Sequence, residues 1–239
     1  MIRIPWLDDE SPAGLFPPLE KALNEPNGLL AAGGNLSSET LLAAYHQGIF
    51  PWFNEGEPLL WWSPDPRCVL FPEKLHISQS MKKVLKNHHY DVRLDSAFAE
   101  VIQACAETRK HTTGTWISIE MQQAYCRLYE LGYAHSVECF ENENLLGGLY
   151  GISLGECFFG ESMFSRKTNT SKIALVLLVK HLRARGIRLI DCQVTSDHLI
   201  SFGAEEIPRT QFASLLEQYV HRQTPIGLWD KQVFEEDAL

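Results

Sequence analysis

Two polar side chains, Asp191 and Gln193, lie two residues apart in an otherwise apolar segment late in the sequence. Residues 187–194 are predicted to form a strand. Because successive side chains of a strand point to opposite faces, Asp191 and Gln193 should share one face. A carboxylate and an amide placed side by side can hydrogen-bond each other and orient one acceptor oxygen. From the spacing alone, a buried polar pair that closes a turn is the alternative interpretation.

A third polar side chain, Glu161, interrupts a predicted strand over residues 157–164 that otherwise carries Phe, Met and Cys. An ionised carboxylate in such surroundings is costly unless it has a partner. One interpretation is a structural salt bridge, with Arg166 as the nearest cation along the chain. The other is a carboxylate that receives a cationic substrate.

Arg166 and Lys167 begin the segment that leads into a predicted buried helix, which Ser171 should cap and which should run to Arg185. Two cations and the free amides of a helix start can bind an anion such as a phosphate. In acyl-CoA acetyltransferases, a strand–loop–helix of this kind carries a glycine-rich pyrophosphate loop. Residues 166–171 contain no glycine, so we do not expect coenzyme A to bind here in the usual way.

A literal GxSxG motif surrounds Ser153, and Asp191 and His198 follow in the chain order of an α/β-hydrolase triad. The serine of a nucleophile elbow needs a helix after it, whereas residues 156–159 have the pattern of a strand. The glycines are more simply explained as those of a hairpin. We therefore keep serine hydrolysis as a disfavoured alternative.

Aromatic and cationic residues supply two possible contacts to nucleic acid. Trp52, Trp61, Trp62 and Trp116 could be stacking platforms for bases, although most tryptophans are simply core residues. Residues 73–93 hold five cations and two acids, a net charge of +3 in a chain whose formal charge is −9. This stretch predicts either a phosphate-binding patch or an ordinary solvated helix face.

The elements that must position these residues fall into two groups. Residues 1–65 are rich in Pro and Gly and show one clear helix, from Ser38 to about Gln47. They predict a small domain with little core of its own, which should pack on the rest of the chain. Residues 66–239 predict an α+β sandwich, an antiparallel sheet crossed by helices. Its elements are expected at residues 68–71, 90–94, 98–107, 119–131, 134–141, 145–153, 157–164, 171–185, 187–194 and 212–220.

Composition excludes several classes of protein. The 239 residues are 45% hydrophobic and 21% charged, which rules out disorder, a collagen-like repeat and a coiled coil. The longest unbroken apolar run, residues 173–179, is far shorter than the ~20 residues that cross a bilayer. The acidic residues soon after Met1 do not resemble a signal peptide, so we expect a protein that is not exported. Six separated cysteines, without a CxxC or HExxH pattern, predict mostly buried thiols and give no support for a metal site.

Taken together, these segments resemble one family, the leucyl/phenylalanyl-tRNA–protein transferases. The resemblance spans roughly residues 15–215, and the combination of motifs is far more specific than any one of them. A small departure is Asn35, where the family usually has Asp; this affects a helix cap and not the chemistry. The matching segments are PNGLLA (26–31), GGNLS (33–37), GIFPWF (48–53), WWSPDPR (61–67), HIS (76–78), GTWI (114–117), GESMFSR (160–166), SK (171–172) and IDCQV (190–194), with His198.

The resemblance implies a small N-terminal domain joined to an acetyltransferase-like (GNAT-like) domain. It also implies transfer of Leu or Phe, sometimes Met, from aminoacyl-tRNA to a protein that begins with Arg or Lys, which marks that protein for N-end-rule degradation. No cofactor, metal or membrane is implied, and we expect a cytoplasmic monomer.

The same resemblance assigns expected roles to individual residues. Asp191 and Gln193 would form the catalytic pair, and Trp52 and Trp116 would contact the terminal adenosine of the tRNA. The side-chain pocket of the donor would be lined by Leu149, Phe158, Met163, Leu175 and Ile190. Two further roles are hypotheses from the residues themselves: Glu161 would receive the cationic end of the acceptor, and the tRNA phosphates would meet Lys82, Lys83, Lys86, Arg166 and Lys167.

Overall fold

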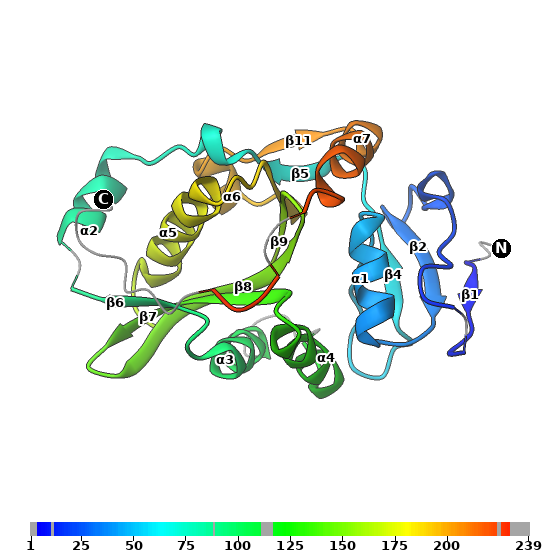
Figure 1. Ribbon diagram of the computed structural model, residues 1–239, viewed down its shortest axis with the longest axis horizontal. Helices are drawn as coiled ribbons and strands as arrows, with labels where there is room; N and C mark the ends of the chain where they lie inside the picture. Colours follow the sequence, from blue (N-terminus) through cyan, green and yellow to red (C-terminus); the bar gives the residue numbers. More distant parts are fainter. Residues whose placement is uncertain (1–3, 11, 88, 111–116, 224–225, 230–239) are drawn as a thin grey trace.

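A computed structural model describes residues 4–10, 12–87, 89–110, 117–223 and 226–229 of the chain. The first part of the chain forms a four-stranded sheet in the order β1-β2-β4-β3 (Figure 1). Helix α1 (Ser38–His46) and the 3-10 turn η1 (Leu19–Lys21) accompany it. The strands are β1 (Trp6–Leu7), β2 (Leu29–Gly33), β3 (Phe50–Pro51) and β4 (Leu60–Trp62).

The rest of the chain builds a seven-stranded sheet in the order β11-β5-β10-β9-β8-β7-β6. All neighbouring pairs are antiparallel except β9 and β10, which run parallel. The expected antiparallel sheet is therefore correct with one exception, and that exception positions the candidate site. The strands are β5 (Arg67–Leu70), β6 (Asp91–Leu94), β7 (Ala134–Glu141), β8 (Asn144–Leu154), β9 (Cys157–Ser165), β10 (Leu189–Gln193) and β11 (Glu205–Ile207).

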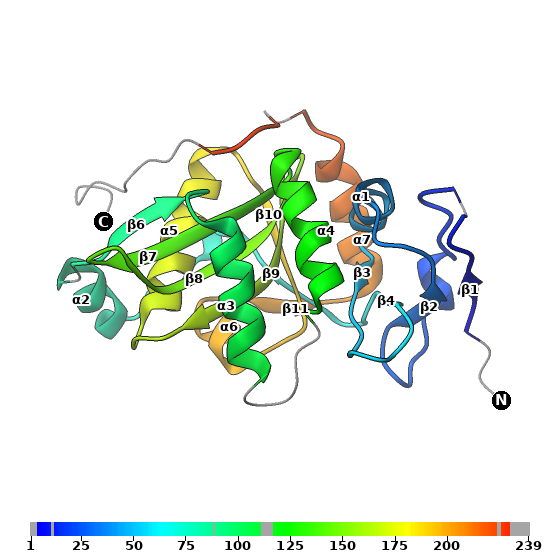
Figure 2. The same ribbon diagram turned by 90° about the horizontal axis from the view of Figure 1, so that it is seen from below.

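Helices cover both faces of the larger sheet. Helices α3 (Phe98–Lys110) and α4 (Ile119–Glu130) lie on one face, and α5 (Thr170–Ala184) lies on the other (Figures 1 and 2). Alternating side chains of β8 enter a different core on each face: Tyr150 packs on the α3–α4 side and Leu149 on the α5 side. The remaining elements are η2 (Pro72–Lys74), α2 (Gln79–Asn87), α6 (Asp197–Ser201) and α7 (Arg209–Val220).

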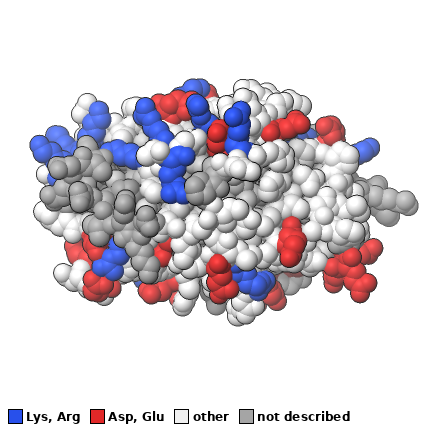
Figure 3. Space-filling view, viewed as in Figure 1, with Lys and Arg blue, Asp and Glu red and all other residues white. Residues whose placement is uncertain are grey.

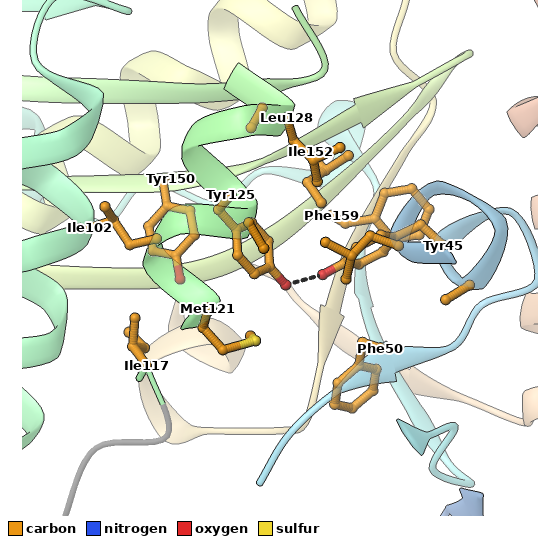
Figure 4. Packing of buried hydrophobic residues seen from close by; sticks show 14 of the residues in the cluster. Tyr45, Phe50, Ile102, Ile117, Met121, Tyr125, Leu128, Tyr150, Ile152 and Phe159 are labelled. Carbon is orange, nitrogen blue, oxygen red and sulfur yellow. Dashed lines mark hydrogen bonds between the residues drawn. The ribbon is translucent and has the colours of Figure 1, made fainter. Parts of the chain in front are cut away.

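The small sheet does not have a separate core. The hydrophobic cluster on the α3–α4 side continues without a break from Leu30 and Trp61 of the small sheet, through Tyr45 of α1, to Tyr125 and Phe159 (Figure 4). This agrees with the expectation that the first part of the chain packs on the remainder. The boundary near residue 65 falls between the last strand of the small sheet and β5, and its status as a domain boundary stays a prediction.

Strands β1–β4 and β11 and helix α6 were not expected, and the elements at the expected positions show local differences. Ser37 caps α1 as the sequence suggests, because its side chain accepts a hydrogen bond from the Thr40 main-chain N–H at 3.2 Å. Helix α5, however, begins one residue before Ser171, and Asn169 takes the N-cap position with a left-handed backbone (φ 71°). The expected strand over residues 187–194 ends at Gln193, whose φ of 56° is outside the range of a strand.

Trp229, in the segment after α7, packs against the larger sheet. Its indole stacks on the buried His135 ring, with centroids 4.0 Å apart and planes 3° apart, and its main-chain N–H donates to Asp95 Oδ2 at 2.7 Å. The same carboxylate accepts the Ser136 main-chain N–H and contacts His135 Nδ1 at 2.8 Å. Trp229 therefore closes a buried polar cluster that joins β6, β7 and the segment after α7.

Of the described helices, none combines the length and the apolar character needed to span a bilayer. All six cysteines are free thiols, and Cys68, Cys105, Cys139 and Cys157 are buried. This confirms the expectation that most of the thiols are buried and reduced.

Replacing Trp229 with Ala should destabilise the fold by ~3–5 kcal/mol, as for other large buried aromatic residues. The stacking on His135 is lost, whereas the main-chain hydrogen bond to Asp95 remains possible. Urea denaturation measures the change. Leu228→Ala is the matched control, because Leu228 is 51% exposed and its loss should matter little. Equal destabilisation by both substitutions would contradict the anchoring role of Trp229.

Candidate functional site

The site lies where β9 and β10 separate. These parallel strands are paired only from Leu189 with Cys157 to Asp191 with Phe159. Beyond that point β9 continues along β8 as far as Ser165, whereas β10 ends at Gln193. A cavity of about 440 Å³ opens between them. Its volume is in the range of small-molecule sites.

The wall of this cavity is mainly apolar, and most of it comes from four elements. Strands β8, β9 and β10 contribute one side, and α5 contributes the other. Because α5 packs directly on the sheet, its buried face forms part of the cavity wall. The apolar residues of these four elements include Leu149, Phe158, Met163, Leu175, Leu178 and Ile190, and residues 50–52 and Leu199 of α6 add to the lining. All five residues expected to line a donor pocket are therefore brought together.

The polar end of the cavity is formed by Glu161 and Gln193, from β9 and β10. Glu161 is the sole acid among the described residues that line the cavity. Tyr45 OH donates to its Oε1 at 2.7 Å, and Tyr125 OH donates to its Oε2 at 3.0 Å. Burial raises the pKa of Glu161 to about 7, although the two phenol hydrogen bonds oppose that shift.

Asp191 lies behind the cavity wall in an ion pair with Arg67. Arg67 Nε and Nη2 donate to the two carboxylate oxygens at 2.8 and 2.7 Å, and both side chains are 1% exposed. The guanidinium also lies between two aromatic rings, 4.9 Å from the centroid of Phe50 and 4.5 Å from that of Phe212. This is a fully buried bidentate pair between β5 and β10.

The expected side-chain hydrogen bond between Asp191 and Gln193 is wrong. Asp191 Oδ1 accepts the main-chain N–H of Gln193 at 3.0 Å, whereas the Gln193 side-chain Nε2 donates to Glu161 Oε1 at 3.4 Å. The physical reason is local: the register of β10 on β5 shifts between the two residues, and Gln193 adopts a left-handed backbone. Only Gln193 of the pair faces the cavity.

The tryptophans expected to contact a base have different outcomes. Trp52 lines the mouth of the cavity and is 43% exposed, and its main-chain oxygen accepts the Trp62 indole N–H at 2.6 Å. Trp61 is fully buried and belongs to the core. Trp116 lies outside the described residues.

The expected phosphate-binding cations fall into two groups. Arg166 forms an ion pair with Glu107 at 3.3 Å, and Lys167 forms one with Glu141 at 2.8 Å, so neither is a free cation. The interpretation of Glu161 as the salt-bridge partner of Arg166 is therefore wrong. By contrast, the ion pairs formed within the described residues include none of the exposed α2 lysines, Lys82, Lys83 and Lys86. Figure 3 shows Lys and Arg side chains gathered at the α2 end of the molecule.

The hydrolase alternative is also wrong. Ser153 is followed by the tight turn between β8 and β9, not by a helix, and Gly155 in that turn has φ 56°. Asp191 is held by Arg67 and makes no contact with His198, which packs edge-on against Phe202 within the described part of the chain.

Three residues of the site were missed by reasoning from the sequence: Arg67, Tyr45 and Tyr125. Tyr45 lies within the expected helix from Ser38 to about Gln47, and Tyr125 lies within the expected helix over 119–131, but neither pattern indicates a polar partner. A usable signal existed for Arg67, because an Arg at the start of an apolar strand needs a buried acid as its partner.

Comparison with protein families decides the assignment. Residues 69–217 match the family profile described as leucyl/phenylalanyl-tRNA protein transferase, and residues 34–65 match the profile of its N-terminal domain. The chain belongs to the leucyl/phenylalanyl-tRNA–protein transferase family. The expected family is thereby confirmed, and the protein is a transferase enzyme.

Curated members of the leucyl/phenylalanyl-tRNA–protein transferase family are similar over nearly the whole chain. The protein of Chromobacterium violaceum is 54% identical over 235 residues, which cover 98% of this chain and 100% of that protein. The protein of Stutzerimonas stutzeri is 58% identical, and the aligned residues cover 91% of this chain and 95% of that protein. That of Nitrosomonas eutropha is 61% identical, with coverage of 84% and 86%.

Solved structures outside this family resemble the chain only loosely. An aminoglycoside acetyltransferase from a soil metagenomic sample is 17% identical with a TM-score of 0.35, covering 59% of this chain and 100% of its own. L-PGS from Bacillus licheniformis is 8% identical with a TM-score of 0.44, covering 81% and 73%. Likenesses at this level carry no argument about the transferase.

Among the described residues, no group of three or more His, Cys, Asp or Glu side chains could hold a metal ion.

Breaking the Arg67–Asp191 pair from one side should cost ~3–5 kcal/mol of stability, because a charge is then left buried and alone. Arg67→Met and Asp191→Leu are each expected to show this loss in urea denaturation. The double variant should lose less than the sum of the two, since no charge remains.

The exposed pair Lys74–Glu205 is the matched control, with side chains 54% and 43% exposed. Lys74→Met should change stability by only ~0–1 kcal/mol. If Arg67→Met is no more destabilising than Lys74→Met, the buried pair is not a major source of stability.

Proposed function

We propose that this protein transfers Leu or Phe, and sometimes Met, from an aminoacyl-tRNA to the N-terminus of a protein that begins with Arg or Lys. The observation that carries the proposal is the apolar cavity at the divergence of β9 and β10, with Gln193 and Glu161 at its polar end. Membership of the leucyl/phenylalanyl-tRNA–protein transferase family supports the same reaction class.

The cavity suits the apolar side chain of the donor amino acid. Leu149, Phe158, Leu175 and Ile190 offer a surface that stabilises Leu or Phe by burial, and a charged side chain would be rejected because it loses its hydration there. Met163 is unbranched and polarisable, so it can adapt to both side-chain shapes.

The tRNA is proposed to meet the protein in two places. Its terminal adenosine would stack on Trp52 at the cavity mouth, and Trp116 is predicted to share that contact. The phosphates of its stem would meet Lys82, Lys83 and Lys86 on α2. Arg166 and Lys167, although predicted for the same role, would first have to leave Glu107 and Glu141.

The reaction needs orientation more than acid–base power. The donor is already an activated ester, and the nucleophile is an α-amine with a pKa of ~8. The amine nitrogen bonds to the ester carbon, the carbon–oxygen bond breaks, and the ribose hydroxyl leaves with a proton. Gln193 is neutral and a poor base, so its role is to accept a hydrogen bond from the amine and hold it in place.

The two other polar groups would act on either side of Gln193. Asp191 acts indirectly, since its carboxylate fixes the Gln193 main chain and contacts Arg67 rather than the cavity. Glu161, the acid of the cavity, is the group that a cationic acceptor end would meet.

Several broader features belong to the same proposal. The sheet crossed by helices would be an acetyltransferase-like fold, with residues 1–65 as a small N-terminal domain and 66–239 as the catalytic domain. The protein would work without a cofactor, as a cytoplasmic monomer, and would mark its acceptors for N-end-rule degradation.

The decisive experiment incubates the protein with radiolabelled Leu-tRNA and a protein that begins with Arg. Label should enter the acceptor, and ribonuclease treatment of the donor should abolish that incorporation. Gln193→Ala should reduce the transfer rate by about 100-fold, the cost of losing the orientation of a reacting group, while aminoacyl-tRNA binding is retained.

Failure of transfer, together with binding of coenzyme A, would favour an acyl-CoA acetyltransferase instead. Covalent labelling of Ser153 by a fluorophosphonate would favour a hydrolase. Gln193→Ala with a normal transfer rate would remove Gln193 from the mechanism.

The α2 lysines supply a separate prediction about tRNA binding. Lys82→Gln, Lys83→Gln and Lys86→Gln should each weaken aminoacyl-tRNA binding and lower the slope of log K against log salt by about one for each phosphate that is no longer neutralised. Fluorescence anisotropy at several salt concentrations measures both. Lys21→Gln, an exposed lysine of η1, is the control. An unchanged salt slope in the combined α2 variant would contradict the phosphate-binding role.

A further inference from the structure

The carboxyl group of Glu161 is enclosed by three polar side chains from three different elements. Tyr45 of α1 and Tyr125 of α4 contact its two oxygens at 2.7 and 3.0 Å. Gln193 of β10 contacts Oε1 at 3.4 Å through Nε2. The two phenol oxygens also lie 2.5 Å from each other, and Figure 4 shows their rings pointing toward one another. The three acidic groups Tyr45, Tyr125 and Glu161 therefore form a closed ring of contacts.

A count of protons shows which state this ring requires. Three oxygen–oxygen contacts need three protons, one in each contact. The two phenols supply two. If Glu161 is ionised, one contact has no proton, and two oxygens then face each other with lone pairs only. If Glu161 is protonated, it donates to one phenol, that phenol donates to the other, and the second phenol donates back to Glu161, so each contact has one proton and the ring is complete.

The surroundings of the ring are consistent with a carboxyl group that keeps its proton. Burial raises the pKa of Glu161 to about 7, and the nearby Asp191 on β10 contributes in the same direction. Hydrogen bonds donated by Tyr45 and Tyr125 lower this pKa, but in the complete ring one of the two phenols accepts from the carboxyl group instead. Arg67 on β5 acts in the opposite direction, but it is already bound to Asp191 by two hydrogen bonds. Tyr150 on β8, beside Tyr125, is the remaining titratable neighbour that affects the phenols.

The same ring determines how the Gln193 amide is turned. The partner that contacts the amide is Glu161 Oε1. In the complete ring the carboxyl proton lies in a contact with a phenol, so Oε1 has only lone pairs left for the amide and can only accept from it. The amide must therefore present Nε2 to Glu161. Its oxygen is then left for the cavity, where an attacking amine needs an acceptor.

We propose that Tyr45 and Tyr125 hold Glu161 in its protonated form, and that Glu161 in this form is the positioning residue that turns the Gln193 amide oxygen toward the substrates. This inference rests on the proposed function, because it assumes that Gln193 contacts the reacting amine. When the proton is lost, the 2.5 Å contact between the phenols is left without a hydrogen and must lengthen. Lengthening of that contact would displace the carboxyl group that Gln193 Nε2 contacts at 3.4 Å, so the amide would lose its fixed orientation.

A protonated Glu161 carries no charge to attract a cation, so this role is an alternative to the cation contact at the same carboxyl group, and the two differ in their kinetic effect. Orientation of Gln193 acts on kcat, whereas a contact between Glu161 and the acceptor's cationic side chain acts on the KM for the acceptor. The sign of the pH dependence also follows: kcat should decline as the pH rises through about 7 and Glu161 loses its proton. Glu161→Gln carries an amide that supplies both a donor and an acceptor, so it imitates the protonated form at every pH.

The first measurement needs no substrate. Infrared difference spectra between the wild type and Glu161→Gln should contain the carbonyl stretch of a protonated carboxylic acid near neutral pH, and this band should disappear as the pH is raised. Glu217→Gln, which removes an exposed carboxylate of α7, should show only carboxylate bands at the same pH. A wild-type spectrum without the protonated band near neutral pH would overturn the proposal.

The second measurement is the pH profile of transfer. Glu161→Gln should lack the alkaline decline in kcat that the wild type shows. Glu161→Ala, which leaves the Gln193 amide without a partner, should have a kcat ~10–100-fold below that of Glu161→Gln, with the KM for aminoacyl-tRNA little changed. Equal kcat values for the two variants would contradict the positioning role. A protonated band in a protein that transfers nothing would instead refute the proposed function and leave the ring of protons standing.

Discussion

The rest of the site depends on the buried ion pair between Arg67 and Asp191. Taking two charges out of water is costly, and here the cost is offset by two short hydrogen bonds and by the two aromatic rings around the guanidinium. The pair joins β5 to β10 at the point where β10 stops running beside β9. Because Asp191 also accepts the Gln193 main-chain N–H, the left-handed turn that aims Gln193 into the cavity is held by the same carboxylate. Asp191 thus supports the chemistry from behind the wall rather than from within the cavity.

The polar end of the cavity is shared between parts of the chain that belong to different sheets. Tyr45 comes from helix α1, which accompanies the small sheet. Tyr125 comes from helix α4, which covers the larger sheet, and Glu161 and Gln193 come from strands of that sheet. Phe50, also from the small sheet, covers one face of Arg67. The continuous hydrophobic cluster around Tyr45 and Phe159 explains how these groups keep their relative positions (Figure 4). The first part of the chain is therefore a component of the site, not an appendage to it.

Local patterns in the sequence predict the longer helices and strands of residues 66–220, because side-chain periodicity depends on neighbours along the chain, but they miss the short strands β1–β4 and β11. The lining of the cavity was also anticipated, through the resemblance of motifs such as residues 160–166 and 190–194 to a known family. The partners of the polar groups were not. Arg67 and Asp191 are 124 residues apart, and Tyr45 and Glu161 are 116 residues apart. No local pattern encodes such pairings. The period-two rule failed at Gln193 because a shift in strand register interrupts the strand there.

The stacking of Trp229 on His135 has a consequence for the order in which parts of the fold can form during synthesis. Asp95 and His135 emerge early in synthesis, but the residue that covers them lies 134 positions after Asp95. Until Trp229 is synthesised, the Asp95 carboxylate and the His135 imidazole, which are buried in the complete fold, remain exposed to water beside the core packed on α5. A product that terminates after α7 would lack this cover, although it contains every residue that lines the cavity. Such a shortened chain would therefore differ from the longer one in its stability rather than in the residues of its active site.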